Sequence, residues 1–277
     1  MTGEGDSSTD RSFIDCLEDT WAHLSSLTHA LDESEWHAPT ECPGWDVAAH
    51  VAHVAGTEAT LLGRPAPPSA PPGPHVRNRL GEMNEAWVQH WRGRPTAELV
   101  AELDEVTAAR LSALRAMSDE ELARPGWSPI GEVPYATFMG IRVMDCWVHE
   151  QDIRQATGRP WRFDGPAAPA AIERLMSSLG FVVGKRVAPG EGCSVALVVS
   201  VDGHQPWEAT YTIVGGRAVP SDPGTDPVAR VGLGGETWVR LATGRLTGGD
   251  ALAAGLVHLD GDRSIGERIV DNLAHIP

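Results

Sequence analysis

The chain has 277 residues, of which 42% are apolar and 22% are charged, a composition typical of a folded globular protein with one or two domains. Its formal net charge of −16 argues against nucleic acids and anionic membranes as partners, because both bind basic patches. No stretch approaches the roughly 20 apolar residues of a membrane helix, and no secretory signal opens the chain. None of the four cysteines forms a CxxC pair, so we expect a cytoplasmic protein with reduced thiols.

The first 160 residues carry apolar side chains at helical spacing, as at Phe13, Leu17, Trp21 and Leu24, and predict an antiparallel helical bundle. The expected helices cover residues 10–29, 46–62, 79–92, 96–117 and 135–157, where 79–92 and 96–117 are either two helices or one helix broken at residues 93–95. Between them, residues 64–74 contain six prolines and predict an extended loop, and residues 118–134 are expected to be irregular. Residues 1–8 are polar, and we expect them to be disordered.

After Trp161 the pattern changes to short β-branched runs separated by turns, which predicts an α+β region. The expected strands are residues 194–201, 207–214, 228–233 and 256–259, and the expected helices are 166–184, 236–243 and 266–274. The predicted fold class is therefore α plus α+β. A helical bundle domain over residues 1–160 is followed by a small α+β domain over residues 161–277.

Two short segments far apart in the chain carry polar residues at a spacing suited to a metal site. In the second of them, Asp145 and His149 stand four residues apart, so on a helix they share one face with Arg142 and Asp152. Together with a histidine from a neighbouring helix they would form a three-ligand site with an open position, which is typical of a catalytic zinc. The alternative is a solvated helix face with an ordinary Asp–His pair.

The two segments resemble signatures of the mycothiol-dependent maleylpyruvate isomerase family. Residues 42–56 (CPGW…AHVAG) are similar to the first signature, and residues 142–154 (R-x-x-D-x-x-x-H-x-x-D-I-R) are similar to the second. Residues 241–245 and 259–262 resemble the C-terminal domain of the family. The resemblance implies a DinB-like four-helix bundle followed by a sterol-carrier-like α+β domain. The arginine-rich composition, in which Lys185 is the only lysine, agrees with an actinobacterial source.

The resemblance also implies the metal ligands, which are His53, Asp145 and His149. The family usually has glutamate where Asp145 stands. Aspartate is shorter by one methylene, so it either pulls the metal towards its own helix or binds the metal less well. His50 is the alternative ligand on the first segment, and either His50 or Asp152 could instead orient a ligand by a hydrogen bond.

Three side chains are candidates for a catalytic role beside the metal, namely Arg142, Asp152 and Arg245. Arg142 could anchor an acidic substrate, or it could pair with Asp145 or Glu150 on its own helix. Arg245 lies in the stretch that resembles the C-terminal domain, where it could reach a substrate carboxylate or be a surface arginine.

Two cysteines lie within the segments. Cys42 stands before the start of a helix, where a thiol can be reactive, but the family pattern favours a structural turn. Cys146 is expected to be a small buried hydrophobic residue rather than a metal ligand.

The function that the resemblance implies is a metal-dependent and mycothiol-dependent isomerase or S-transferase acting on a small, electrophilic, carboxylated substrate. A divalent metal, most simply zinc, would be the cofactor and would deprotonate the thiol of mycothiol, the co-substrate. The thiolate could add to an activated double bond, allow rotation and leave, or it could stay attached. Two alternatives remain open. One is a thiol-independent metalloenzyme of the same fold in natural-product tailoring, and the other is a non-catalytic small-molecule-binding protein.

Overall fold

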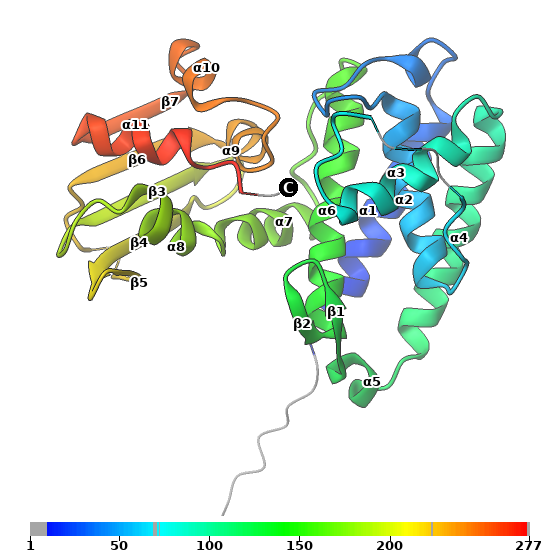
Figure 1. Cartoon of the computed structure of the whole chain (residues 1–277), viewed down its shortest axis with the longest axis horizontal. Coiled ribbons are helices and arrows are strands. Elements are labelled where there is room, and N and C mark those ends of the chain that lie inside the picture. The colour runs from blue at the N-terminus through cyan, green and yellow to red at the C-terminus, as the bar shows by residue number, and fades with distance from the viewer. Residues whose placement is uncertain (1–9, 69–70, 72, 223, 276–277) are drawn as a thin grey trace, which may run out of the picture. The chain divides into compact units, whose positions relative to one another are not determined.

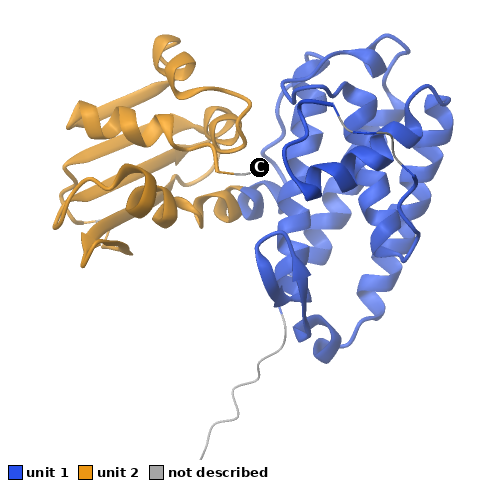
Figure 2. Cartoon of the chain, viewed as in Figure 1, with its two compact units in different colours: residues 1–171 blue, residues 172–277 orange. Residues whose placement is uncertain are grey.

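The computed structural model describes residues 10–68, 71, 73–222 and 224–275. The chain divides into two units, residues 1–171 and 172–277 (Figure 2). The predicted boundary, between residues 160 and 161, follows the last bundle helix, which ends at Ala156. The stretch predicted to be disordered, residues 1–8, lies outside the described residues, as do residues 69, 70 and 72 of the proline-rich loop. Among the described helices, none combines the length and the apolar composition needed to cross a membrane.

Helices α1, α2, α4 and α6 form the bundle of the first unit, and α3 packs against α2 (Figure 1). Their bounds are Ser12–His29 for α1, Val47–Leu61 for α2, Arg79–Trp91 for α3, Thr96–Ala116 for α4 and Tyr135–Ala156 for α6. Each helix begins and ends within two residues of its predicted range, so the helical periodicity of the sequence is confirmed in this unit. A short 3₁₀ turn, η1, spans Glu35–His37 between α1 and α2.

The core of the bundle is made of the apolar stripes that gave the helices their periodicity. Leu17 and Leu24 of α1, Leu103 and Leu114 of α4 and Trp147 of α6 are completely buried. Burial of a large apolar side chain stabilises a fold by about 1.5–3 kcal/mol. These stripes therefore determine which face of each helix points inward, and with it the direction of the polar side chains beside them.

The connection between α4 and α6 is more regular than predicted. It contains a short helix and a β-hairpin, with bounds Asp119–Ala123 for α5, Pro125–Ser128 for β1 and Gly131–Pro134 for β2. Helix α5 begins with a capping box, in which Ser118 and Glu121 each accept a hydrogen bond from the backbone of the other. The Ser-x-x-Glu pattern that signals such a helix start is present in the sequence, so the prediction of an irregular connection is wrong.

The second unit is built on a five-stranded sheet with the order β5-β4-β3-β6-β7. The strands are Ser194–Ser200 for β3, Trp207–Val214 for β4, Arg217–Pro220 for β5, Ala229–Gly234 for β6 and Val257–Gly261 for β7. The pair β3–β6 is parallel, and the other three pairs are antiparallel. The four predicted strands are confirmed, whereas β5 is a short edge strand that the sequence analysis did not predict.

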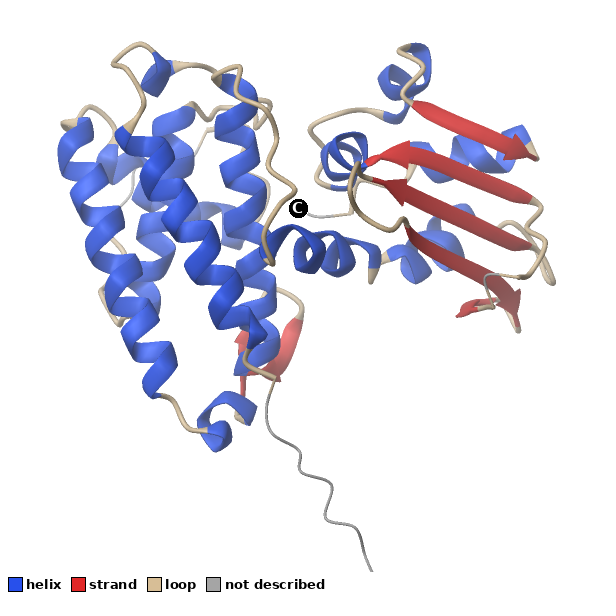
Figure 3. Cartoon of the chain, turned by 180° about the vertical axis from the view of Figure 1, so that it is seen from behind, coloured by secondary structure: helices blue, strands red, loops and turns tan. Residues whose placement is uncertain are grey.

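Helices cover one face of this sheet, where α8 and α11 lie side by side over the strands (Figure 3). The bounds are Ala167–Met176 for α7, Leu179–Phe181 for α8, Gly235–Ala242 for α9, Gly248–Ala253 for α10 and Arg263–Asp271 for α11. The single helix predicted over residues 166–184 is interrupted, because α7 and α8 are separate and a π-helical segment, η2 (Val182–Val187), follows. The fold class predicted from the sequence, a helical bundle followed by an α+β region, is confirmed.

Gly56 allows α2 and α3 to approach closely, and this contact can be tested. A Cβ atom on Gly56 would lie 2.2 Å from Cγ of Trp87, whereas a Cβ atom on Gly140 of α6 would meet no atom within 4 Å. We expect Gly56→Ala to lower the free energy of unfolding by about 1–3 kcal/mol through overpacking. The control, Gly140→Ala, should raise it by up to about 1 kcal/mol through helix propensity. Urea denaturation measures both values, and equal stability of the two variants would contradict the contact.

Candidate metal centre

Helix α6 turns several polar side chains into the bundle. Arg142 is 4% exposed, and His149 and Asp152 are each 7% exposed. Asp145 is the most accessible member of the stripe, with 27% of its side chain exposed. Most of this polar stripe is therefore buried in the bundle. The alternative considered for the sequence was a solvated helix face. Because a buried charge is costly without a partner, each of these side chains needs a compensating contact.

Helix α2 supplies two histidines opposite this stripe. The helix begins at the predicted N-cap, where the side chain of Asp46 accepts a hydrogen bond from the backbone N–H of Ala49 at 2.9 Å. His50 and His53 follow within the first two turns and are 0% and 3% exposed. Their spacing of three residues places both on the side of α2 that faces α6.

The three predicted metal ligands lie together. Nε2 of His53 is 3.0 Å from Oδ2 of Asp145, and Nε2 of His149 is 3.7 Å from Oδ1 of the same carboxylate. The ring centroids of His53 and His149 are 4.8 Å apart. Four ligands placed tetrahedrally about zinc at about 2.0–2.1 Å stand about 3.3 Å from one another, a value that the two carboxylate contacts bracket. Two imidazoles and a carboxylate are also ligand types that zinc accepts, so this group fits a divalent ion.

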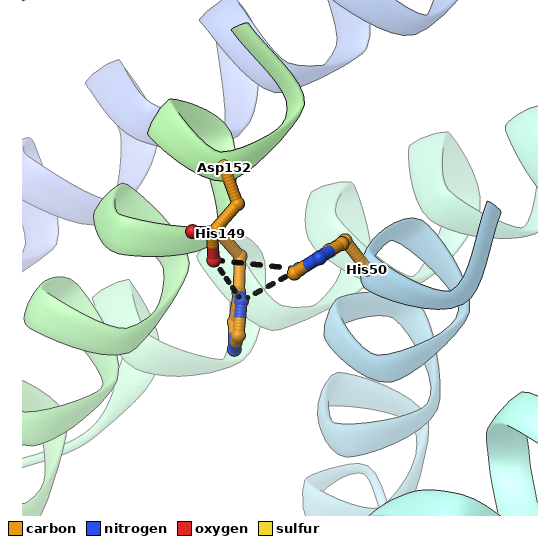
Figure 4. Close-up of side chains that lie close together, drawn as sticks. All are labelled: His50, His149 and Asp152. Carbon is orange, nitrogen blue, oxygen red and sulfur yellow. Dashed lines mark hydrogen bonds and ion pairs between the residues drawn. The ribbon is translucent and has the colours of Figure 1, made fainter. Parts of the chain in front are cut away.

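A second group of possible ligands uses the other nitrogen of the same His149 ring. Nδ1 of His149 lies 2.8 Å from Nδ1 of His50 and 3.1 Å from Oδ2 of Asp152 (Figure 4). Nδ1 of His50 lies 3.5 Å from that carboxylate oxygen. His50, the alternative ligand of the sequence analysis, therefore contacts His149 on the side that faces away from Asp145. The two groups share one ring but meet it at different atoms.

Trp45 stands against all three histidines. Its ring centroid is 5.3 Å from those of His50 and His53 and 5.7 Å from that of His149. The indole N–H donates to Oε2 of Glu85 at 3.2 Å, which fixes the orientation of the ring. The first signature therefore provides an aromatic wall for all three histidines, in addition to His50 and His53.

A buried charge network connects the site to the rest of the bundle. Glu58 of α2 is 0% exposed and accepts from Nε of Arg110 at 2.9 Å and from Nη2 of Arg142 at 2.8 Å. Arg142 also donates to Oδ2 of Asp145, the oxygen that His53 contacts. The guanidinium group of Arg142 thus contacts both Glu58 and the proposed metal ligand Asp145. The contact with Asp145 is the pairing within one helix that the sequence analysis considered.

The protonation states of the group suit a metal ion. Burial alone would raise the pKa of Asp145, but the charge of Arg142, together with His53 and His149, holds the pKa of this carboxyl well below its ordinary value. Burial lowers the pKa of His53, so that its imidazole is neutral. An ionised carboxylate and a neutral imidazole are the forms that bind metals. Among the described residues, Nδ1 of His53 has no hydrogen-bond partner, in contrast to Nδ1 of His149.

The remaining candidates divide between the two units. Arg142 and Asp152 both lie at the site, the latter through its contact with His149. Arg245 belongs to the second unit, where its guanidinium donates to the backbone oxygen of Thr243 at 2.9 Å, and its catalytic role stays a prediction. Cys146 is 0% exposed, and burial raises the pKa of its thiol to about 12, so it behaves as the small buried residue that was expected.

Glu58 and Arg110 are absent from the sequence-based set of site residues, although a signal existed. Arg110 stands four residues after Val106 and four before Leu114, both of which are buried, so it occupies a position on an apolar stripe. A charged residue at such a position predicts a buried partner of opposite charge. The sequence does not say which carboxylate that partner is.

Comparison with known proteins identifies the family. A family model described as the mycothiol maleylpyruvate isomerase N-terminal domain matches residues 17–154. Uncharacterised proteins of two Mycobacterium tuberculosis strains are 32% identical over 149 residues, which cover 52% of this chain and 79% of each relative. The chain belongs to the mycothiol maleylpyruvate isomerase family. The resemblance of the two signatures is thereby confirmed.

Solved structures of the mycothiol maleylpyruvate isomerase family share the fold. The alignment with the crystal structure of the mycothiol-dependent maleylpyruvate isomerase H52A mutant covers 90% of this chain and 91% of the mutant's chain, with 18% identity and a TM-score of 0.53. The alignment with the crystal structure of the mycothiol-dependent maleylpyruvate isomerase covers 84% of this chain and 88% of the isomerase chain, with 20% identity and a TM-score of 0.52. At these identities the likeness shows the fold, a helical bundle followed by an α+β region.

Proposed function

We propose that this protein is a cytoplasmic, metal-dependent and mycothiol-dependent isomerase or S-transferase acting on a small, electrophilic, carboxylated substrate. The observation that carries the proposal is the convergence of His53, Asp145 and His149 from two helices, with carboxylate contacts of 3.0 and 3.7 Å. Membership of the isomerase family supports the thiol as co-substrate. A bound divalent ion, most simply zinc, would supply the chemistry that converts a coordinating thiol into a thiolate at neutral pH.

The residues of the chain suit this role in three ways. As metal ligands, two imidazoles and one carboxylate supply a single negative charge, so an anionic fourth donor balances a divalent ion better than a neutral donor does. Asp152 accepts a hydrogen bond from His149 and holds the ring in place. Trp45 limits the access of water to the histidines, which strengthens electrostatic interactions at the site.

The structure suggests why aspartate at position 145 matters. The short side chain keeps its carboxylate close to α6, within reach of Arg142 three residues earlier. Oδ2 of Asp145 is already contacted by both Arg142 and His53. A metal ion would therefore share this oxygen with a guanidinium group, which weakens binding relative to a carboxylate that extends farther from the helix.

His149→Ala tests the metal centre. We expect this variant to lose the metal that the purified protein carries, because His149 provides one of three ligands and two remaining ligands bind too weakly. His29→Ala is the matched control, since His29 of α1 is exposed and pairs with Asp104. Plasma mass spectrometry of protein prepared without chelator gives the metal content. Full occupancy in His149→Ala would falsify the ligand assignment.

Asp145→Glu tests the effect of side-chain length. We expect this variant to keep or tighten metal binding, because glutamate restores the residue usual in the family and moves the carboxylate away from Arg142. Competition with a chromogenic chelator measures the affinity for zinc, with Asp145→Asn as the variant that removes the charge. If the glutamate protein releases zinc under conditions in which the aspartate protein retains it, Asp145 is not a ligand in the proposed sense.

Cobalt-substituted protein tests the role of the thiol. We expect mycothiol to perturb the visible spectrum of the bound cobalt and to add a sulfur-to-metal charge-transfer band, whereas S-methylmycothiol, which forms no thiolate, should not. With maleylpyruvate as a trial substrate, an isomerase regenerates mycothiol and a transferase consumes one thiol per product. An unchanged spectrum favours the thiol-independent metalloenzyme. A wild-type protein that takes up no metal favours the non-catalytic binding protein.

A further inference from the structure

The two ring nitrogens of His149 face different partners, and in a neutral imidazole only one of them carries a hydrogen. We propose that Thr40 and His50 are positioning residues that keep this hydrogen on Nδ1 of His149 and leave the lone pair of Nε2 for a metal ion. We call this chain of contacts the Thr40–His50 relay. Its use for metal binding rests on the proposed function, but the position of the hydrogen is a property of the metal-free protein.

The first step concerns the hydroxyl of Thr40, which has one hydrogen and two lone pairs. Its Oγ1 lies 3.0 Å from the backbone oxygen of Trp45, an atom that only accepts, so the hydroxyl hydrogen is donated there. The backbone N–H of Cys42 donates to Oγ1 at 3.2 Å. The remaining lone pair faces Nε2 of His50 at 2.8 Å, and this nitrogen must therefore be the donor. His50 carries its hydrogen on Nε2.

The second step passes this constraint to His149. A neutral His50 with its hydrogen on Nε2 presents a lone pair on Nδ1. Nδ1 of His149 lies 2.8 Å away, a distance that requires a hydrogen between the two nitrogens, so His149 donates. Asp152 supports this assignment, because a carboxylate only accepts and its Oδ2 lies nearer Nδ1 of His149, at 3.1 Å, than Nδ1 of His50, at 3.5 Å. The reverse assignment would direct a lone pair of His149 at the carboxylate.

The third step is the consequence for metal binding. With the hydrogen on Nδ1, the lone pair of His149 lies on Nε2, which is directed to the side of Asp145 and His53. The Thr40–His50 relay thereby determines which of the two groups of possible ligands receives a lone pair from His149. The group of His53, Asp145 and His149 receives the lone pair of Nε2, whereas the group of His50, His149 and Asp152 receives the hydrogen of Nδ1. Metal-binding histidines generally have their other nitrogen fixed in this manner.

Nitrogen-15 NMR of metal-free protein labelled at histidine tests the assignment directly, since ring nitrogens with and without hydrogen resonate at well separated positions. His149→Gln and His50→Gln identify the signals of the two rings. We expect the hydrogen on Nδ1 of His149 and on Nε2 of His50. A hydrogen on Nε2 of His149 in the wild-type protein overturns the proposal, and the two glutamine variants serve only to assign the wild-type signals.

Matched threonine variants test the role of the hydroxyl. Thr40→Val removes it, Thr40→Ser retains it, and Thr28→Val removes a hydroxyl that donates to the backbone oxygen of Ser25 at 2.8 Å within α1. We expect Thr40→Val to distribute the hydrogen of His149 over both nitrogens and to weaken zinc binding roughly 10–100-fold. Thr40→Ser and Thr28→Val should match the wild type. A folded Thr40→Val protein that is unchanged in both measurements overturns the proposal.

The two readouts separate this proposal from that of the metal centre. If the wild-type protein binds no zinc but carries the hydrogen on Nδ1 of His149, the relay is supported and the metal function fails. If it binds zinc but carries the hydrogen on Nε2 when metal-free, the relay fails and the metal function stands.

Discussion

The pairing of a buried carboxylate with two buried guanidinium groups is the constraint on which the first unit depends. Glu58 lies between Arg110 and Arg142, and all three side chains are at most 5% exposed. Each charge would cost several kcal/mol if it were buried alone, so the three must be brought together as the bundle forms. They come from α2, α4 and α6. Their pairing therefore fixes the positions of three of the four bundle helices relative to one another.

The same constraint prepares the proposed metal centre. Arg142 contacts Glu58 with one part of its guanidinium and Asp145 with another. This contact keeps Asp145 ionised and fixes its carboxylate opposite His53. The metal-free protein therefore already holds this proposed ligand in the charge state that binds metals. An ion at this position would compete with Arg142 for one oxygen of Asp145, so the charge balance along α6 would be part of the metal affinity.

The sequence predicted what depends on local spacing. Helix periodicity located five helices because each buries one apolar stripe, and the four-residue spacing of Asp145 and His149 placed both on one face of α6. The pairing of Glu58 with Arg110 depends on how α2 and α4 meet, and periodicity carries no information on that. The contact of Thr40 with His50 depends on the turn between them, which is set by hydrogen bonds of the backbone. For His53 the missing information on contacts between helices came from the family signatures, because they relate residues that are far apart in the chain.

The exposure of the ligands indicates how a thiol would reach the proposed ion. Of the three side chains, Asp145 is 27% exposed, whereas those of His53 and His149 are 3% and 9% exposed. Nδ1 of His149 and its partners His50 and Asp152 form the buried side of the group. An incoming ligand would therefore approach from the side of Asp145, where it would meet the same carboxylate that Arg142 contacts. Because a thiolate is attracted to a guanidinium group, Arg142 would favour entry of the thiolate as well as orient the carboxylate of Asp145. Arg142 would thereby link the stability of the bundle, through Glu58, to the chemistry of the proposed metal centre.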